Sequence, residues 1–351
     1  MNRRNFVSIF IRVNLITLLF TASAWAGTVY DLTADWSDTT NPNGVWSVNS
    51  GSVPLQPVAD LTDTGIDYFP TPQPGFTAQP VFDDIVPVWF RSTGPLDNGN
   101  PDWEIGDIIT HTSRFDVPNS NVTWTSDFDG AIDILGSVWP TREMGGINDW
   151  FLYHNEVLLT GGTVASWDQY DRSSPFLFEL GAGGLSVLQD IPVIVGDVVK
   201  LELVHQGGGS EDYVGVDLNI VGKPIISCVG FEPPMDNYPV TAKKNRALPL
   251  KAELFDAAGL PVLGSDLSAP PILQVWQLYS TPAADDVSDD ALAAGQGTVG
   301  NQFVFTDDLK WQFNLKTSNY RGPGTYTVIM ESGDPSEYVI NPSCLTEFIV
   351  K

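Results

Sequence analysis

The sequence is poor in the residues on which many reactive sites depend. Only two cysteines and three histidines occur among 351 residues, too few for a cysteine–histidine zinc cage. The sequence also lacks the Gly-x-Ser-x-Gly elbow of hydrolases, the His-Glu-x-x-His helix of metalloproteases and a phosphate-binding glycine loop. We therefore predict a protein that is not an enzyme and that requires no cofactor.

Positive charge is scarce as well, with 17 lysines and arginines against 43 aspartates and glutamates. Such an acidic chain repels the phosphates of nucleic acids and anionic lipid headgroups, so we expect neither as a partner. A polysaccharide or cell-surface glycan, or a cation, remains compatible with this charge.

A long apolar run is confined to the N-terminus. Two arginines near the start and a third at position 12 precede an apolar core at 15–20, and an Ala-Trp-Ala cleavage site follows at 24–26. This order predicts a signal peptide over residues 1–26, and export to the cell envelope or the extracellular space by the general or the twin-arginine route. The alternative is an uncleaved membrane anchor, which we disfavour because the run is too short to span a bilayer. Cleavage leaves 14 basic and 43 acidic residues, a net charge of −29.

Long helical patterns are lacking, whereas turn-forming residues are frequent, with 32 glycines and 26 prolines. Short runs place an apolar residue at every second position, for example at 28–36, 130–139, 150–160, 197–206 and 212–222. This alternation is typical of half-buried antiparallel strands, and a series of them predicts a jelly-roll-like β-sandwich over residues 27–222.

The pattern changes near residue 222. The segment 222–239 contains four prolines, and we expect it to act as a linker followed by the first strand of a new unit. Further short strand-like runs predict an immunoglobulin-like β-sandwich over residues 223–351. Cys228 lies near the start of this unit and Cys344 before its last strand. In an oxidising compartment we expect a disulfide between them, with two buried free thiols as the alternative.

Two resemblances bear on these units. Pro249-Leu250-Lys251-Ala252 and the block 301–328 resemble a bacterial extracellular domain named for its Pro-x-Lys-Phe signature, with Ala252 in place of the phenylalanine. This resemblance covers about residues 225–351 and implies a surface-exposed immunoglobulin-like module with no known catalysis. The region from 30–49 to 212–222 resembles the N-terminal domains of exported bacterial proteins of the type that carries a Pro-Glu-Pro C-terminal sorting tail (PEP-CTERM), which are similar to carbohydrate-binding jelly rolls.

The stretch 137–162 concentrates aromatic and charged residues. We predict a hairpin whose turn is at 154–156, and a polar loop at 140–149 in which Arg142 and Asp149 bind sugar hydroxyls beside Trp139. Trp150 has apolar residues on both sides in its strand, so we expect it in the core. The alternative for the whole stretch is a core strand plus a loop.

Eight tryptophans lie in the predicted first domain, residues 27–222. Aromatic rings stack on the apolar faces of sugar rings, so this excess suggests carbohydrate binding. We expect Trp124 in the core, and the candidates for exposed platforms are those beside predicted turns: Trp46, Trp89, Trp103 and Trp167. The alternative is that all of these rings fill the sandwich core.

Asp127, Asp129 and Asp133 form an acidic cluster that does not match an EF-hand loop. A weak Ca²⁺ site at these three residues is one hypothesis, and a solvated acidic surface is the other.

Three functions are compatible with these patterns. The leading hypothesis is a non-catalytic protein that binds glycans or belongs to an extracellular matrix. The second is a purely structural or adhesive surface module. The third is a polysaccharide hydrolase whose carboxylate pair is assembled only in space.

Overall fold

A computed structural model describes residues 27–351 apart from several short segments. The segments left out are 65–68, 79–86, 95–101, 113–117, 142–145, 208–212, 243–245, 279–283, 289–299, 319 and 321–322. The predicted signal peptide and Arg142 therefore lie outside the described residues.

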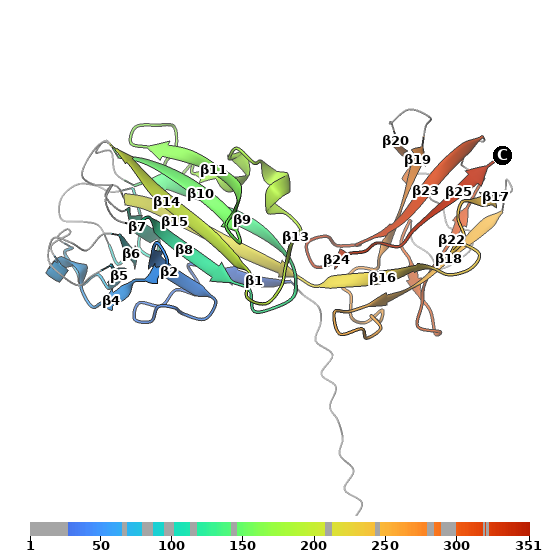
Figure 1. Ribbon diagram of the computed structural model, residues 1–351, viewed down its shortest axis with the longest axis horizontal. Coiled ribbons are helices and arrows are strands. Elements are labelled where there is room, and N and C mark those ends of the chain that lie inside the picture. The colour runs from blue at the N-terminus through green and yellow to red at the C-terminus, as the bar shows by residue number, and fades with distance from the viewer. Residues whose placement is uncertain are drawn as a thin grey trace, which may run out of the picture.

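The regular secondary structure of the described chain is almost entirely β-strand, and Figure 1 shows the strands in two groups. The first group runs from Thr28 to Lys223 and the second from Ile225 to Val350. The predicted fold class, all-β with successive sandwiches, is confirmed. No helix among the described residues is both long and apolar enough to cross a membrane.

The first group consists of two antiparallel sheets, which we call the first sandwich. The larger sheet contains β1 (Thr28–Asp31), β4 (Gln56–Val58), β5 (Gly75–Thr77), β6 (Val88–Arg91), β7 (Ile108–His111), β9 (Gly130–Pro140), β12 (Phe176–Leu177), β13 (Ile191–Val193) and β15 (Tyr213–Lys223). Its order is β12-β9-β15-β7-β6-β5-β4, with β1 also beside β15 and β13 also beside β9. The smaller sheet contains β2 (Trp46–Ser50), β3 (Val53–Pro54), β8 (Ser120–Thr125), β10 (Ile147–His154), β11 (Val157–Ala165) and β14 (Val198–Gly207), in the order β11-β10-β14-β8-β2-β3.

The alternation seen in the sequence decides which residues lie between these two sheets. In β14, Val199, Leu201 and Leu203 are buried while the residues between them are partly exposed. Trp124 of β8 and Trp150 of β10 are fully buried in the same core, as predicted. Each strand therefore contributes every second side chain to the core and presents the others on its outer face.

Strand β15 is an inner strand of the nine-stranded sheet, with neighbours along both edges. It pairs with β9 along one side, and with β7 and then β1 along the other. Val214, Val216 and Leu218 point into the core, so Gly215 and Asp217 lie on the outer face of this sheet.

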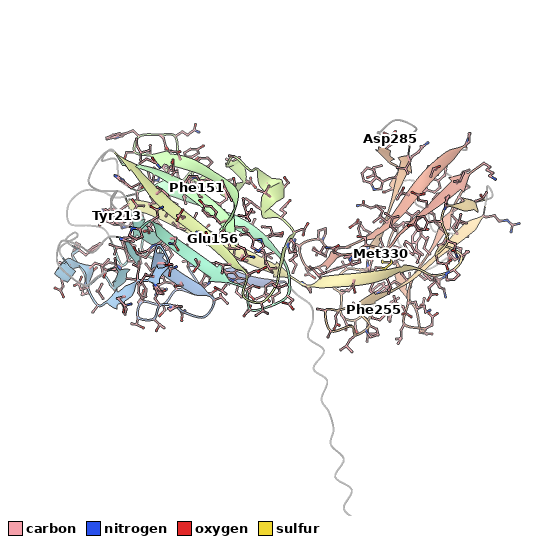
Figure 2. All side chains as sticks on the ribbon, in the orientation of Figure 1. Phe151, Glu156, Tyr213, Phe255, Asp285 and Met330 are labelled. Atoms are coloured by element: carbon pink, nitrogen blue, oxygen red, sulfur yellow. A yellow bond between two sulfur atoms is a disulfide. The ribbon has the colours of Figure 1, made fainter. Side chains whose placement is uncertain are left out.

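The predicted hairpin within 137–162 is confirmed. Strands β10 and β11 pair antiparallel around a two-residue turn, Asn155-Glu156, in which both residues have positive φ. Phe151 and Glu156 of this hairpin are labelled in Figure 2. The predicted polar loop is shorter than expected, because β9 extends to Pro140 and β10 already begins at Ile147.

The second group, which we call the second sandwich, consists of two five-stranded sheets. One contains β16 (Ile225–Phe231), β18 (Ala247–Phe255), β21 (Val304–Phe305), β22 (Trp311–Lys316) and β24 (Val339–Ile340), and the other β17 (Val240–Ala242), β19 (Ile272–Leu278), β20 (Ala284–Asp286), β23 (Gly324–Glu331) and β25 (Leu345–Val350). The orders are β21-β22-β18-β16-β24 and β17-β25-β23-β19-β20. With β16, β18, β19, β21, β22, β23 and β25 taken as strands A to G, these orders contain the ABED and CFG sheets of an immunoglobulin-like sandwich.

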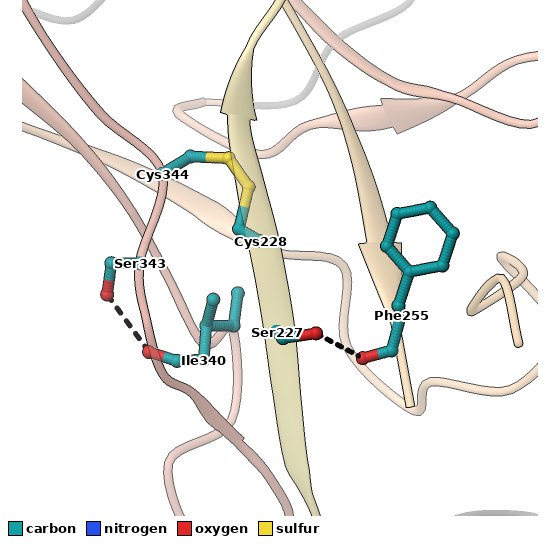
Figure 3. Close-up of a disulfide and its surroundings, with 6 residues drawn as sticks. All are labelled: Ser227, Cys228, Phe255, Ile340, Ser343 and Cys344. Atoms are coloured by element: carbon teal, nitrogen blue, oxygen red, sulfur yellow. Dashed lines mark hydrogen bonds between the residues drawn. A yellow bond between two sulfur atoms is a disulfide. The ribbon is translucent and has the colours of Figure 1, made fainter. Parts of the chain in front are cut away.

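Cys228 and Cys344 lie at disulfide distance, with Cα atoms 5.3 Å apart, and Figure 3 shows the pair joining β16 to the segment before β25. Around the pair, the Ser227 hydroxyl donates to the Phe255 carbonyl and the Ser343 hydroxyl donates to the Ile340 carbonyl. The predicted pairing therefore connects the first strand of the second sandwich to the approach to its last.

The connection between the sandwiches is much shorter than the predicted linker. Strand β15 ends at Lys223 and β16 begins at Ile225, so only Pro224 lies between them. Within 222–239 the expected first strand of a new unit is β16, whereas the linker before it is a single residue and the other three prolines follow the strand. The two main core clusters lie on either side of Pro224 and have no residue in common.

Candidate functional site

Loops cover one end of the outer face of the nine-stranded sheet. Val88, Phe90, Ile109 and Tyr213 point outward from their strands and form a small second core with loop residues, among them Trp103. The Trp103 indole Nε1 donates to the carbonyl oxygen of Gly94 at 3.0 Å. This end of the face is therefore closed to ligands.

Trp139 of β9 lies next to this covered region and packs flat against the sheet. Its ring covers Gly215 on the neighbouring strand, where an added Cβ would lie 2.1 Å from Cε2 of the indole. The indole Nε1 donates to the carbonyl oxygen of Asp102 at 2.9 Å. Glycine at 215 is thus required for the ring to lie on the sheet, and only 5% of Trp139 is exposed.

An open cavity of about 240 Å³ lies beside Trp139 on this outer face. It is formed by segments that are far apart in the sequence: the turn after β1, the start of β7 with the residue before it, the last part of β9, the segment between β11 and β12, and the middle of β15. Six side chains give the cavity its chemistry: Thr33, Asp107, Ser137, Trp139, Arg172 and Asp217.

Arg172 forms one wall of the cavity and is held firmly. Its Nε and Nη2 donate to the two carboxylate oxygens of Asp107 at 2.6 and 3.1 Å, and Nη1 lies 3.3 Å from Oε1 of Glu104. Its backbone N–H also donates to Asp102 Oδ2 at 2.6 Å. The hydrogen bonds to Asp107 raise the pKa of Arg172, so the guanidinium remains charged and ties the two loops together.

Asp217 lies at the exposed mouth of the cavity, with Asn219 Nδ2 donating to its Oδ1 at 2.8 Å. Desolvation by the surrounding atoms raises the pKa of the Asp217 carboxyl, and the negative charges of Asp31 and Asp107 raise it further. A neutral carboxylic acid is therefore more accessible here than at an ordinary surface aspartate.

Ser137 lies directly opposite Asp217 in the sheet and lines the same cavity. It is only 4% exposed, and its hydroxyl has no hydrogen-bond partner among the residues that the structure describes. A buried hydroxyl facing a cavity is available to donate to and accept from a bound molecule.

The predicted tryptophan platforms are mostly internal. Trp46, Trp89 and Trp103 are buried, so the expectation that they are exposed is wrong. Each indole N–H already has a partner within the fold: Asp35 for Trp46, Ser120 for Trp89 and Gly94 for Trp103. Trp167 is 66% exposed, as expected, but does not line the cavity.

The predicted position of Asp149 in a polar loop is also wrong. Asp149 lies within strand β10 and not in a loop, and it accepts a hydrogen bond of 2.5 Å from the Thr163 hydroxyl on β11. Because β10 belongs to the six-stranded sheet, Asp149 lies on a different sheet from Trp139.

The three aspartates considered for calcium do not converge. Asp127 accepts from the Tyr30 hydroxyl, Asp129 from the backbone N–H of Val195, and Asp133 from Lys223. Within the described ranges, no group of three or more acidic, histidine or cysteine side chains is placed to hold a metal ion. The Ca²⁺ hypothesis at these three positions stays a prediction, and the contacts of the three carboxylates do not support it.

The cavity was not predicted, although its residues carry a recognisable pattern. Asp217 and Asn219 are polar residues at outward positions of an otherwise apolar strand, and Ser137 has the same place in β9. Comparison of the sequence with known protein families and with curated proteins finds no match.

Proposed function

We propose that this protein is an exported, non-catalytic glycan-binding protein that holds one sugar residue in the cavity beside Trp139. The observation that supports this most directly is the Ser137 hydroxyl, which is buried, faces the cavity and has no partner in the described structure. Sugars present many hydroxyl groups, each of which both donates and accepts, and such a side chain suits them.

The composition of the cavity supports the same class of ligand. It combines an aromatic wall at Trp139 with a fixed guanidinium at Arg172 and carboxylates at Asp107 and Asp217. Its volume of about 240 Å³ lies below the range of about 300–1,000 Å³ that is typical of pockets for drug-sized ligands. A single ring of a longer polysaccharide suits this space better than a buried oligosaccharide.

Export is the second part of the proposal. It is supported by the signal-like sequence of residues 1–26 and by the cysteine pair at disulfide distance, because disulfides persist mainly in oxidising compartments. The resemblance of residues 225–351 to a bacterial extracellular module agrees with this location. In this proposal the second sandwich carries the first at a cell surface or in a matrix.

A glycan array probed with residues 27–351 tests the proposal, followed by titration of the best ligand. Ser137→Ala should weaken binding by about 0.5–1.5 kcal/mol, the usual net contribution of one hydrogen bond. The matched control is Ser47→Ala on β2 of the other sheet, which should leave affinity unchanged. An array without any binding would instead favour a structural or adhesive module, and equal effects of the two variants would place the site elsewhere.

One observation favours a hydrolase as the second candidate. The raised pKa of Asp217 and the pairing of Asp107 with Arg172 give two carboxyl groups in different environments at one cavity. Glycosidases use such a difference, with one carboxyl as the acid and another as the nucleophile or base. Release of reducing ends from a bound polysaccharide that disappears in Asp217→Asn would establish this candidate, whereas a non-catalytic protein releases none.

A further inference from the structure

Negative charge exceeds positive charge around the cavity. Asp107 and Asp217 line it, and the carboxylate of Asp31 is close enough to Asp217 to raise its pKa. Arg172 is the one cationic side chain among the lining residues that the structure describes, and Asp107 and Glu104 already engage its guanidinium. The charges of Asp31 and Asp217 therefore lack a matching cation at this site.

The polar groups at the mouth are arranged to accept hydrogen bonds. The Asp31 carboxylate is fixed by the backbone N–H groups of Thr33 and Ala34, at 2.8 and 3.1 Å. Asp217 accepts from Asn219, which leaves its second oxygen for a ligand, and the Ser137 hydroxyl stands opposite on β9. A ligand group with several N–H donors and a positive charge matches this set.

We infer that the sugar held in this cavity is an amino sugar with a free, protonated amine, whose ammonium group lies between Asp217 and Ser137. This inference rests on the proposed function. A primary ammonium has three N–H donors, and its hydrogen bonds to a carboxylate are charge-assisted and stronger than those of a neutral hydroxyl. An N-acetylated amine carries no charge and offers one N–H, so it matches the site less well.

Two simpler occupants agree less well with the site. A neutral sugar would leave the Asp31 and Asp217 charges without compensation. A bare metal ion needs several converging ligands, and the described residues contain no group of three or more acidic, histidine or cysteine side chains placed for one.

Binding should depend on pH in a defined direction. The groups that face Asp217 are Asp31 from β1, Asp107 before β7, Asn219 on its own strand and Arg172 from the segment before β12. Because the pKa of Asp217 is raised, the carboxyl loses the charge that attracts the amine at a higher pH than an ordinary aspartate does. Affinity should therefore rise with pH through the Asp217 pKa, and binding should release protons.

The test is a titration of residues 27–351 with the methyl glycosides of glucosamine, N-acetylglucosamine and glucose, followed by NMR at neutral pH and low ionic strength. Glucosamine should bind about tenfold more tightly than the other two, which corresponds to about 1.4 kcal/mol. Asp217→Asn should remove this preference, so that glucosamine binds no more tightly than glucose, and thermal melting should show that the variant is folded. The matched control, Asp149→Asn on the six-stranded sheet, should keep the preference.

The outcomes separate this inference from the proposed function. If glucose or N-acetylglucosamine binds as tightly as glucosamine, the cavity is a sugar site without amine preference, and only the inference fails. If no sugar binds here or on the array, the proposed function fails as well. If ethanolamine binds as tightly as glucosamine, or Asp217→Asn keeps the preference, the amine is not recognised as part of a sugar at this cavity, and the inference is overturned.

Discussion

Single residues in the first sandwich are held in conformations or environments that disfavour them. The surroundings of Asp217 oppose its negative charge, because neighbouring atoms desolvate it and Asp31 and Asp107 repel it. Glu156 adopts a positive φ of 66°, although it is not glycine. Each feature should lower the stability of the fold, and a substitution that removes the feature measures by how much.

Replacing Asp217 should make the protein more stable at neutral pH. An unfolded aspartate ionises near pH 3.9, whereas the pKa in the folded protein is raised, so the folded state binds more protons between the two values. Stability therefore falls as pH rises through the folded pKa. Asp217→Asn should melt at a higher temperature than the parent at neutral pH, and the difference should vanish below about pH 3.9. A lower melting temperature at neutral pH would mean that the ionised carboxylate is stabilising.

Glu156 is a second residue whose replacement should make the protein more stable. Asn155 and Glu156 form a two-residue hairpin turn with both φ values positive, a turn type that favours glycine at its second position. Glu156→Gly should raise the free energy of unfolding by about 0.5–1 kcal/mol in urea denaturation, because the left-handed conformation costs a non-glycine residue energy. Glu156→Gln is the control, since it removes the ion pair with Lys200 but keeps the strained backbone. Equal stability of the two variants would show that the turn stores no strain.

At the scale of elements, strand β10 has one buried face and one partly exposed face. Trp150 is fully buried against Phe176 and Phe178, with ring centroids 5.3 and 5.2 Å away. The next residue, Phe151, points to the other side and is only partly buried. The hairpin thus contributes to the core through alternate residues.

Trp150→Ala should therefore lower the free energy of unfolding by about 3–5 kcal/mol, the usual loss for a large aromatic in a core. Phe151→Ala, one residue away on the opposite face, should cost clearly less in the same denaturation experiment. If the two substitutions cost the same, the buried face does not dominate the stability of this strand.

The alternation of β14 and the burial of Trp124 and Trp150 were predictable, because residue spacing along one strand determines its two faces. Trp89 also lies in this core between the sheets. The burial of Trp103 was not predictable, because it depends on loops that fold over the outer face of the nine-stranded sheet. The cavity was missed for the same reason. Its residues come from five separate segments, and no local spacing connects Arg172 with Asp217.

At the scale of the whole molecule, the junction between the sandwiches contains a buried charge. Lys223 is 2% exposed, and its Nζ lies 2.7 Å from Asp133 and 2.6 Å from Asp190, one residue before the connecting Pro224. Desolvation raises the pKa of Glu331 in the second sandwich, and the charge of Asp190 raises it further. The two sandwiches thus influence each other electrostatically where they meet.

Lys223→Met should lower the free energy of unfolding of the first sandwich by about 3 kcal/mol, because it leaves two neighbouring carboxylates without their cation. The control is Lys251→Met, which breaks a longer, partly exposed pair with Asp308 and should cost about 1 kcal/mol or less. Urea denaturation followed by tryptophan fluorescence checks both variants. A cost for Lys223→Met no greater than that of the control would show that the buried triad adds little.

The position of the disulfide pair has a mechanical consequence. Thr28 pairs with Gly222, so the first sandwich begins and ends at the same place, beside Pro224. Tension between Gly27 and Lys351 passes from there along β16 to Cys228 and crosses directly to Cys344, a bond that spans 116 positions of the chain. In single-molecule pulling the first sandwich should unravel while the second keeps its length, and a reductant should add about 400 Å of extension, at about 3.5 Å per residue. A chain stretched between two attachment points would thus yield only in the half that contains the cavity beside Trp139, and would release any molecule held there as it yields.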